Sequence, residues 1–383
     1  MDMIDLGGTF RACTPEQTLA RLEPILREEF GITRVANVTG LDDIGIHTFV
    51  AIRPNAKLLS TSQGKGISKP LAKISAIMEG VEGWHAENLS PPDLWGTHAE
   101  LSQNYLLCGM EGLNQGFFYT EQPEHYSIPW KKTNNLFNGK PTYIPYSLIC
   151  LDFVQMAKGF EINPPSSNGL ASGNTLPEAI CHALFEVVER DCEAQMLKTE
   201  RPNLLDFDTV TSSHIKALLK HIHSKNYNIN VWDIRNEIGI PTYYAELDDL
   251  SNPRTLGVFA GCGSHLSDEI AMSRAITEAV QARLTFISGS RDDIHTKSYS
   301  NPESKYKDHD NSHKTGQPKP LAIPECFESM QDTILTMLQA QGYDQAYLYD
   351  HTRQEYGIPV VHALVPGLEF EVTQHSHSDK TRK

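Results

Sequence analysis

The 383-residue chain lacks the features of several protein classes. Its seven cysteines are an odd set without a Cys-x-x-Cys pair, which argues against a disulfide framework and against a cysteine-ligated zinc site. Acidic residues outnumber basic ones by 48 to 33, so a basic face for nucleic acid or an anionic membrane is not expected. No apolar run reaches the roughly 18 residues of a membrane-spanning helix. No secretory signal is visible at the start. We expect a soluble, cytoplasmic protein without nucleic-acid or membrane partners.

The composition that is present, 39% apolar and 21% charged, is globular. We expect one domain over residues 1–370, with a polar loop at about 291–320 and a flexible tail at 371–383. An aromatic- and proline-rich segment at about 104–146 is expected to form loops over the core.

Three stretches share one pattern, in which a helical segment is followed by two strand-like runs around a Gly-Ile connector. The helical segments and connector glycines are 15–29 with Gly45, 214–225 with Gly239, and 329–341 with Gly357. Glycine is expected where a tight turn needs positive φ. We interpret them as three helix–hairpin units of an α/β protein of the α+β kind, with chance similarity as the alternative for any one pair.

A second repeat carries carboxylates. The pattern x-Ala-apolar-x-Glu-x-Val-Glu/Gln occurs in three stretches with helical periodicity. At about 100° per residue, the polar positions of each stretch share one face. These positions are Ser75, Glu79 and Glu82; Glu178, His182, Glu186 and Glu189; and Arg274, Glu278 and Gln281. Thr175 is the expected N-cap of the middle helix. Arg283 joins the third face only if that helix bends.

These glutamates have an alternative interpretation as solvated outer faces of amphipathic helices. Against it, their neighbours are small and apolar rather than lysine-rich, and the glutamates recur at one register. If the helices pack around one axis, the carboxylates converge and need cations. Oxygen ligands favour magnesium, calcium or manganese, and magnesium indicates a polyphosphate substrate. Arg190 and Arg274 would neutralise phosphate oxygens, and Lys65 lies between two glycines that allow an anion to approach.

Taken together, the motifs resemble the signature segments of the YcaO family. The segments are SQGKGISKPLAKISAIMEGVEGWHAE, SSNGLASGNTLPEAICHALFEVVERDCEA and RAITEAVQARLTFISGSRDD. With GITRVANVTGLDDIG and GIPVVHALVPGLE, the resemblance covers most of residues 8–293 and 345–369. The first segments are most similar to the branch found with TfuA-type partner proteins. The resemblance implies a YcaO-like fold in which three Glu-bearing helices line a central cleft for ATP and magnesium.

The resemblance also implies an enzyme that modifies a backbone amide of a ribosomally synthesised peptide or of a protein site. A nucleophile adds to the amide carbon, and the adduct oxygen is phosphorylated from ATP and leaves. A side-chain nucleophile gives an azoline and sulfide gives a thioamide. By position, the implied metal ligands are Glu79, Glu82, Glu186 and Glu189. The implied nucleotide-site residues are Arg11, Lys65, Ser75, Glu178, His182, Glu278 and Gln281, and Arg190 and Arg274 would act on the phosphate.

Two departures from the family pattern leave alternatives open. Gly83 stands where the family often has arginine, and the proline-rich ending of azoline-forming members is absent, which favours a thioamide or another amide product. One alternative is a non-catalytic nucleotide-binding subunit, and another is a carboxylate-bridged metal enzyme without ATP. A TfuA-like or other peptide-recognising protein is the expected partner, and a homodimer stays open. Cys262, between two glycines, is the thiol retained near the site.

Overall fold

The computed structural model describes residues 3–110, 125–156, 166–198, 203–251, 256–294 and 313–369. Helices and mainly antiparallel sheets confirm the predicted α+β class. The predicted polar loop lies outside the described residues at 295–312, and so does the predicted tail at 371–383. No helix in the described part of the chain has both the length and the apolar character to cross a bilayer.

The first unit is a three-stranded antiparallel sheet, in the order β3-β4-β5, flanked by two helices. Its elements are α1 (Pro15–Leu22), β3 (Arg34–Asn37), β4 (His47–Ile52), β5 (Thr61–Gly66) and α2 (Lys69–Glu87). A hairpin of β1 (Ile4–Asp5) and β2 (Phe10–Arg11) precedes it.

The second unit repeats this arrangement with the order β11-β12-β13. Its elements are α6 (Ser213–Ser224), β11 (Tyr227–Asp233), β12 (Thr242–Asp249), β13 (Phe259–Ser264) and α7 (Asp268–Ser288). Two short strands extend the sheet beyond β11, β10 (Asn203–Leu205) and β14 (His313–Thr315).

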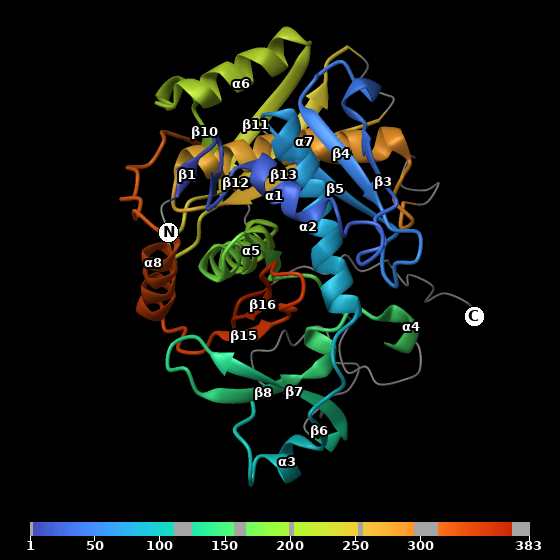
Figure 1. The fold of residues 1–383 in the computed structure, drawn as a ribbon. Helices are drawn as coiled ribbons and strands as arrows, with labels where there is room; N and C mark the ends of the chain where they lie inside the picture. The colour runs from blue at the N-terminus through green and yellow to red at the C-terminus, as the bar shows by residue number, and fades with distance from the viewer. Residues whose placement is uncertain are drawn as a thin grey trace, which may run out of the picture.

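The third unit has the same arrangement in a different chain order. Its helix and hairpin come last, as α8 (Phe327–Ala340), β15 (Tyr347–Asp350) and β16 (Val360–Leu364). Its inner strand and Glu-bearing helix come from the middle of the chain, as β9 (Leu170–Ser172) and α5 (Leu176–Met196). Strand β9 pairs antiparallel with β16. Figure 1 shows α5 near the centre of the molecule, with α7 above it and β16 below.

The third sheet continues into a lower extension, visible at the bottom of Figure 1. It consists of β6 (Leu94–Gly96), β7 (Ile128–Asn135) and β8 (Pro141–Pro145). The helices α3 (His98–Leu101) and α4 (Phe153–Met156) are short, as are three 3₁₀ turns at Thr39–Leu41, Tyr146–Leu148 and Phe207–Thr209. The expectation of loops over 104–146 is therefore wrong where β7 and β8 lie.

The predicted helix–hairpin units are confirmed, with one boundary shifted. The connector glycines Gly45, Gly239 and Gly357 have φ of 81°, 81° and 63°, as the turn requires. Helix α1 ends at Leu22 rather than at residue 29, and turns follow it. Thr14 and Gln17 form a capping box at its start.

In two of the units, glycine lets the inner strand lie directly against the Glu-bearing helix. A Cβ on Gly64 of β5 would lie 2.0 Å from the Ala76 nitrogen of α2. A Cβ on Gly263 of β13 would lie 2.2 Å from the Ala271 oxygen of α7. The helices therefore pack backbone against backbone on their strands, and their polar faces are directed away from the apolar core.

Candidate active site

A single cavity of about 780 Å³ receives the polar faces of α2, α5 and α7. Its lining includes Arg11, Lys65, Ser75, Glu79, Glu82, Glu178, His182, Glu186, Glu189, Arg190, Arg274, Glu278 and Gln281. These are all of the side chains that the family resemblance assigned to the metal, nucleotide and phosphate sites. The structure thus brings them together, while the role of each stays a prediction.

The second polar position of each helix reaches the inner strand of a neighbouring unit. Glu82 of α2 accepts from the Ser172 N–H of β9 at 2.8 Å and from its hydroxyl at 2.6 Å. Glu189 of α5 accepts from the Ser264 N–H of β13 at 3.0 Å. These contacts link the units around the cavity.

Helix α7 makes the corresponding contact to the first unit, with a longer hydrogen bond. The amide of Gln281 on α7 donates to the Gln63 side chain on β5 at 3.5 Å. Glu79, at the first acidic position of α2, accepts from the backbone N–H of the same strand residue at 3.2 Å. The cavity wall is therefore continuous from α7 through β5 to α2.

Four carboxylates on α2 and α5 are short of positive charge. Burial raises the pKa of Glu79 to about 7 and the pKa values of Glu82 and Glu186 to about 8. Burial also raises the pKa of Glu189, against the nearby charge of Arg190. A cation placed among these groups would favour their ionised forms.

Helix α7 and strand β5 contribute the cations Arg274 and Lys65 to the cavity wall. Burial tends to raise the pKa of Glu278, but the Lys65 ammonium forms an ion pair with it and holds that pKa below its usual value. Arg274 lines the cavity with a buried Nε that has no hydrogen-bond partner. An unsatisfied guanidinium N–H at this place fits an anionic ligand such as phosphate.

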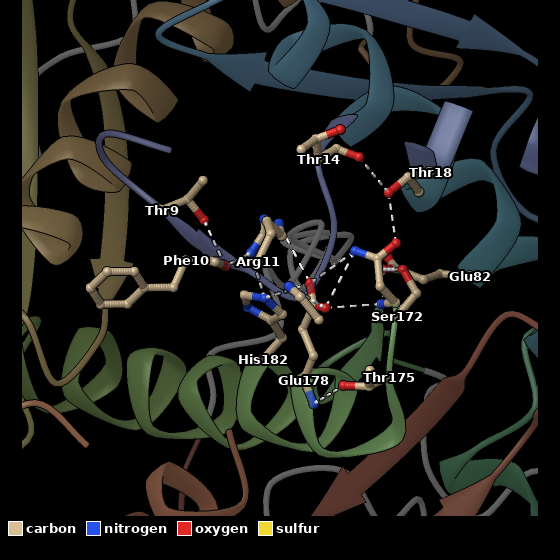
Figure 2. A network of polar contacts seen from close by, with 12 residues as sticks. Thr9, Phe10, Arg11, Thr14, Thr18, Glu82, Ser172, Thr175, Glu178 and His182 are labelled. Atoms are coloured by element: carbon tan, nitrogen blue, oxygen red, sulfur yellow. Dashed lines mark hydrogen bonds and ion pairs between the residues drawn. The ribbon is translucent and has the colours of Figure 1, made fainter. Parts of the chain in front are cut away.

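The N-terminal segment covers one edge of the cavity and is tied to α5 (Figure 2). The Arg11 guanidinium donates to His182 Nε2 at 2.5 Å, which requires a neutral imidazole with its proton on Nδ1. Burial, with the charges of Arg11 and Arg274, lowers the pKa of His182 far below its usual value. Glu178 accepts from the Ala12 N–H at 3.1 Å and lies 3.7 Å from Arg11 Nε. In this state Arg11, His182 and Glu178 hold the segment in place.

Arg190 is held by two carboxylates. It lies 3.3 Å from Glu189 and 2.8 Å from Glu193. These carboxylates and Glu278 raise the pKa of Arg190, although burial opposes them. Thr175 caps α5 as predicted, because its hydroxyl accepts from the Glu178 N–H at 3.3 Å.

The carboxylates fit magnesium by their chemistry, because they are hard oxygen ligands. Glu79, Glu82 and Glu189 each accept a strand N–H with one carboxylate oxygen, which leaves the other oxygen for a cation. Among the residues that the structure describes, no group of three or more His, Cys, Asp or Glu side chains is arranged to hold a metal ion. Magnesium is often held by one or two carboxylates together with phosphate oxygens and water, and the cavity offers that kind of site.

Two side chains considered from the sequence lie elsewhere. Arg283 faces away from the cavity and pairs with Asp42 at 2.7 Å and Asp249 at 3.1 Å, because α7 does not bend toward the site. Cys262 is buried in β13 and does not line the cavity, and burial raises the pKa of its thiol. It has the environment of a structural thiol.

The polar side chains of the cavity that sequence reasoning missed include Cys13, Arg53 and Arg291. Arg53 lies beside Gly83, whose missing Cβ would be 3.0 Å from its Nη1, and pairs with Glu87 at 2.5 Å. Arg291 lies three residues after the end of α7. The signal for Arg291 was its place in the segment SGSRDD directly after the third helix.

With this fold and site in view, the chain belongs to the YcaO family. Residues 63–369 match the family model described as a YcaO cyclodehydratase that binds ATP and Mg²⁺. ATP and Mg²⁺, the cofactors implied by the sequence, are thus confirmed at the level of the family. An uncharacterized protein in the tfuA 3′ region of Rhizobium leguminosarum bv. trifolii is 34% identical over 95% of this chain and 89% of its own length.

Solved structures share the fold. YcaO from Methanopyrus kandleri bound with AMPPCP and Mg²⁺ has a TM-score of 0.71 at 19% identity, covering 96% of this chain and 94% of that one. A heterocyclase in complex with substrate and cofactor has a TM-score of 0.76 at 23% identity and covers 94% of this chain. The present chain spans about half, 53%, of the length of that heterocyclase. At these identities, the two structures establish the fold.

Proposed function

We propose that this chain uses MgATP to modify a backbone amide of a ribosomally synthesised peptide or of a protein site. The observation that carries the proposal is the charge asymmetry of the cavity. Four carboxylates with raised pKa values line the cavity from α2 and α5, and Arg274 and the Lys65–Glu278 pair line it from α7 and β5. A ligand that combines a divalent cation with a polyphosphate matches both sides.

Each residue has a defined task in this proposal. Glu79, Glu82, Glu186 and Glu189 hold magnesium. Arg274 uses its unsatisfied Nε for a phosphate oxygen, and Arg190 acts on the same group from α5. Lys65, Ser75, Glu278 and Gln281 line the nucleotide site, while Arg11, Glu178 and His182 close its N-terminal edge.

When bound, MgATP supplies the phosphoryl group that turns the oxygen of the amide adduct into a leaving group. The amide carbonyl is otherwise a poor electrophile. Phosphoryl transfer needs positioning and charge neutralisation more than covalent chemistry by the protein. The residues of this cavity provide both, and no nucleophile from the chain is required. The product is a thioamide with external sulfide or an azoline with a neighbouring Cys, Ser or Thr side chain of the substrate.

A TfuA-like or other peptide-recognising protein would present the substrate. The Rhizobium relative in the tfuA 3′ region supports this partner. The non-catalytic subunit is the alternative that the same cavity permits, because nucleotide binding alone needs the same side chains.

The test measures phosphate release and product mass with peptide, partner, MgATP and sulfide. The proposal expects release that depends on peptide, with exchange of oxygen for sulfur or loss of one water. The double variant Glu79→Gln with Glu186→Gln should abolish both. Tight MgATP binding without any turnover, with peptide and partner present, would instead establish the non-catalytic subunit.

A further inference from the structure

Arg291 is an arginine of the cavity to which the roles above give no task. Its segment is fixed against the start of β5. The Thr61 hydroxyl donates to the Ser290 carbonyl at 3.0 Å, and the Ser60 N–H donates to the Asp292 carboxylate at 3.0 Å. The residues on both sides of Arg291 are therefore anchored at the start of the strand that carries Lys65.

The guanidinium of Arg291 is paired with one carboxylate and influences a second one in the cavity. It makes a two-point ion pair with Asp293, with Nε at 2.9 Å and Nη2 at 2.5 Å. It also acts on Glu79 across the cavity, where its charge opposes the effect of burial on the pKa of that carboxyl. Arg291, Asp293 and Glu79 all line the same cavity, so the ion pair lies beside the proposed metal and phosphate site.

The cationic side chains of the cavity differ in the solvent exposure of the carboxylate with which each is paired. That carboxylate would lose its partner if the cation turned to a ligand. The partner of Arg291 is 37% exposed. Less exposed carboxylates, at 1% to 25%, hold the other paired cations, Arg11, Arg53, Lys65 and Arg190. Leaving a buried carboxylate without its cation is costly, whereas a hydrated one loses little. Among the paired cations that the described residues place in the cavity, Arg291 can exchange partners at the lowest cost.

We propose that Arg291 exchanges Asp293 for a phosphate group of bound MgATP beside Glu79. The proposal rests on the function proposed above and adds a phosphate contact to it. The planar guanidinium binds two oxygens of a phosphate as it binds the two oxygens of a carboxylate, so both hydrogen bonds are kept in the exchange. Asp293 occupies the guanidinium until the nucleotide arrives and competes with it.

Calorimetry of MgATP binding to the full chain tests this exchange. Arg291→Gln should weaken binding by about tenfold or more, the effect of losing a charge-assisted hydrogen bond. Asp293→Asn should bind MgATP at least as tightly as the unaltered chain, because the competitor loses its charge. Arg34→Gln removes an exposed arginine of β3 as the matched control and should leave affinity unchanged.

Thermal unfolding with and without MgATP separates ligand contact from a structural role. Under the proposal, Arg291→Gln keeps the unfolding midpoint of the nucleotide-free chain and loses part of the shift caused by MgATP. A lowered midpoint with an unchanged shift would overturn the exchange and leave a structural ion pair. Unchanged affinity in Arg291→Gln would also overturn it, while the function proposed above would stand. Absence of MgATP binding by the unaltered chain would overturn both.

Discussion

The carboxylate of Glu189 on α5 accepts a hydrogen bond from the backbone N–H of Ser264 on β13 and so fastens one unit of the fold to the next. Glu82 makes the equivalent contact from α2 to Ser172 on β9. The glutamates therefore have a structural task that exists without any ligand. Their recurrence in the sequence reflects this shared geometry, whether or not they also bind the proposed cations.

The two tasks of Glu189 are separable by substitution. In Glu189→Gln the amide oxygen still accepts from the Ser264 N–H, while the buried charge is gone. We expect this variant to unfold at the same denaturant concentration as the unaltered chain, or higher at pH 8, and to lose magnesium-dependent ATP binding. Glu189→Ala leaves a buried N–H unsatisfied and should lose about 1–3 kcal/mol of unfolding free energy. Equal destabilisation by both changes, in urea unfolding, would contradict a structural role for the hydrogen bond.

Close packing of α7 on β13 makes a second prediction. A methyl group at position 263 would lie 2.2 Å from the Ala271 oxygen and 2.7 Å from the Ala275 nitrogen. We expect Gly263→Ala to cost about 1–3 kcal/mol of unfolding free energy or more, because a backbone cannot yield as a side chain does. Gly40→Ala is the matched control, since no heavy atom lies within 4 Å of its added Cβ. Chemical unfolding followed by circular dichroism measures both, and equal midpoints would refute the packing argument.

The sequence predicted the units well where the signal was local. Helical periodicity and the connector glycines are set within a few residues, so three helix–hairpin units could be recognised. The permuted third unit could not, because β9 and β16 pair residues as distant as Ser172 and Val360. No short-range pattern encodes such a pairing.

The sequence analysis also failed to predict strands with polar residues and a cationic residue placed by a loop. Strand β7 contains Lys131, which is buried yet satisfied, because its ammonium donates to the Pro91 carbonyl at 2.7 Å. Partners of this kind are invisible in a composition that resembles a loop. Arg291 was missed for a related reason, since its position in the cavity depends on the anchoring of its loop to β5 rather than on helical register.

The raised pKa values predict a pH dependence of stability. Unfolded glutamates titrate near about 4.3, whereas Glu79, Glu82 and Glu186 titrate at about 7 to 8 in the folded chain. From about pH 6.5 up to about pH 8 the folded state holds protons that the unfolded state has lost, so the unfolding free energy falls as pH rises and levels off above about pH 8. His85 and His362, whose pKa values burial lowers to about 4, are neutral in the folded state, whereas unfolded imidazoles titrate at about 6.5, so these histidines oppose the fall below about pH 7.5.

Urea unfolding at several pH values checks this prediction. The loss in the magnesium-free chain should be about 1–2 kcal/mol, less than the full ~1.4 kcal/mol per pH unit for each proton, because solvent screens the exposed Glu79 and the partly buried Glu82 and Glu186. Saturating Mg²⁺ with ATP should flatten the curve, because the cation then favours the ionised carboxylates. A magnesium-free stability that stays constant or rises over this window would show that these carboxyls are ionised at pH 6.5 already.

The ion pair between Lys65 and Glu278 makes the last prediction. The Lys65 ammonium of β5 supplies the positive charge that balances Glu278 on α7. Both side chains are only partly exposed, at 17% and 25%. Lys65→Met should leave Glu278 short of positive charge and destabilise the magnesium-free chain, by about 1–3 kcal/mol after allowance for solvent at this exposure. Glu278→Gln added to it should recover most of the loss, because no unpaired carboxylate then remains.

A double-mutant cycle in denaturant measures this coupling directly. Independent effects of the two substitutions would mean that the pair contributes nothing to the fold. MgATP binding distinguishes the effect of Lys65 on nucleotide affinity from its effect on stability. The double variant should regain stability, while its affinity stays weakened by the loss of a cation near the phosphates. Recovery of both stability and affinity would assign Lys65 to neutralising Glu278 alone and remove it from the nucleotide site.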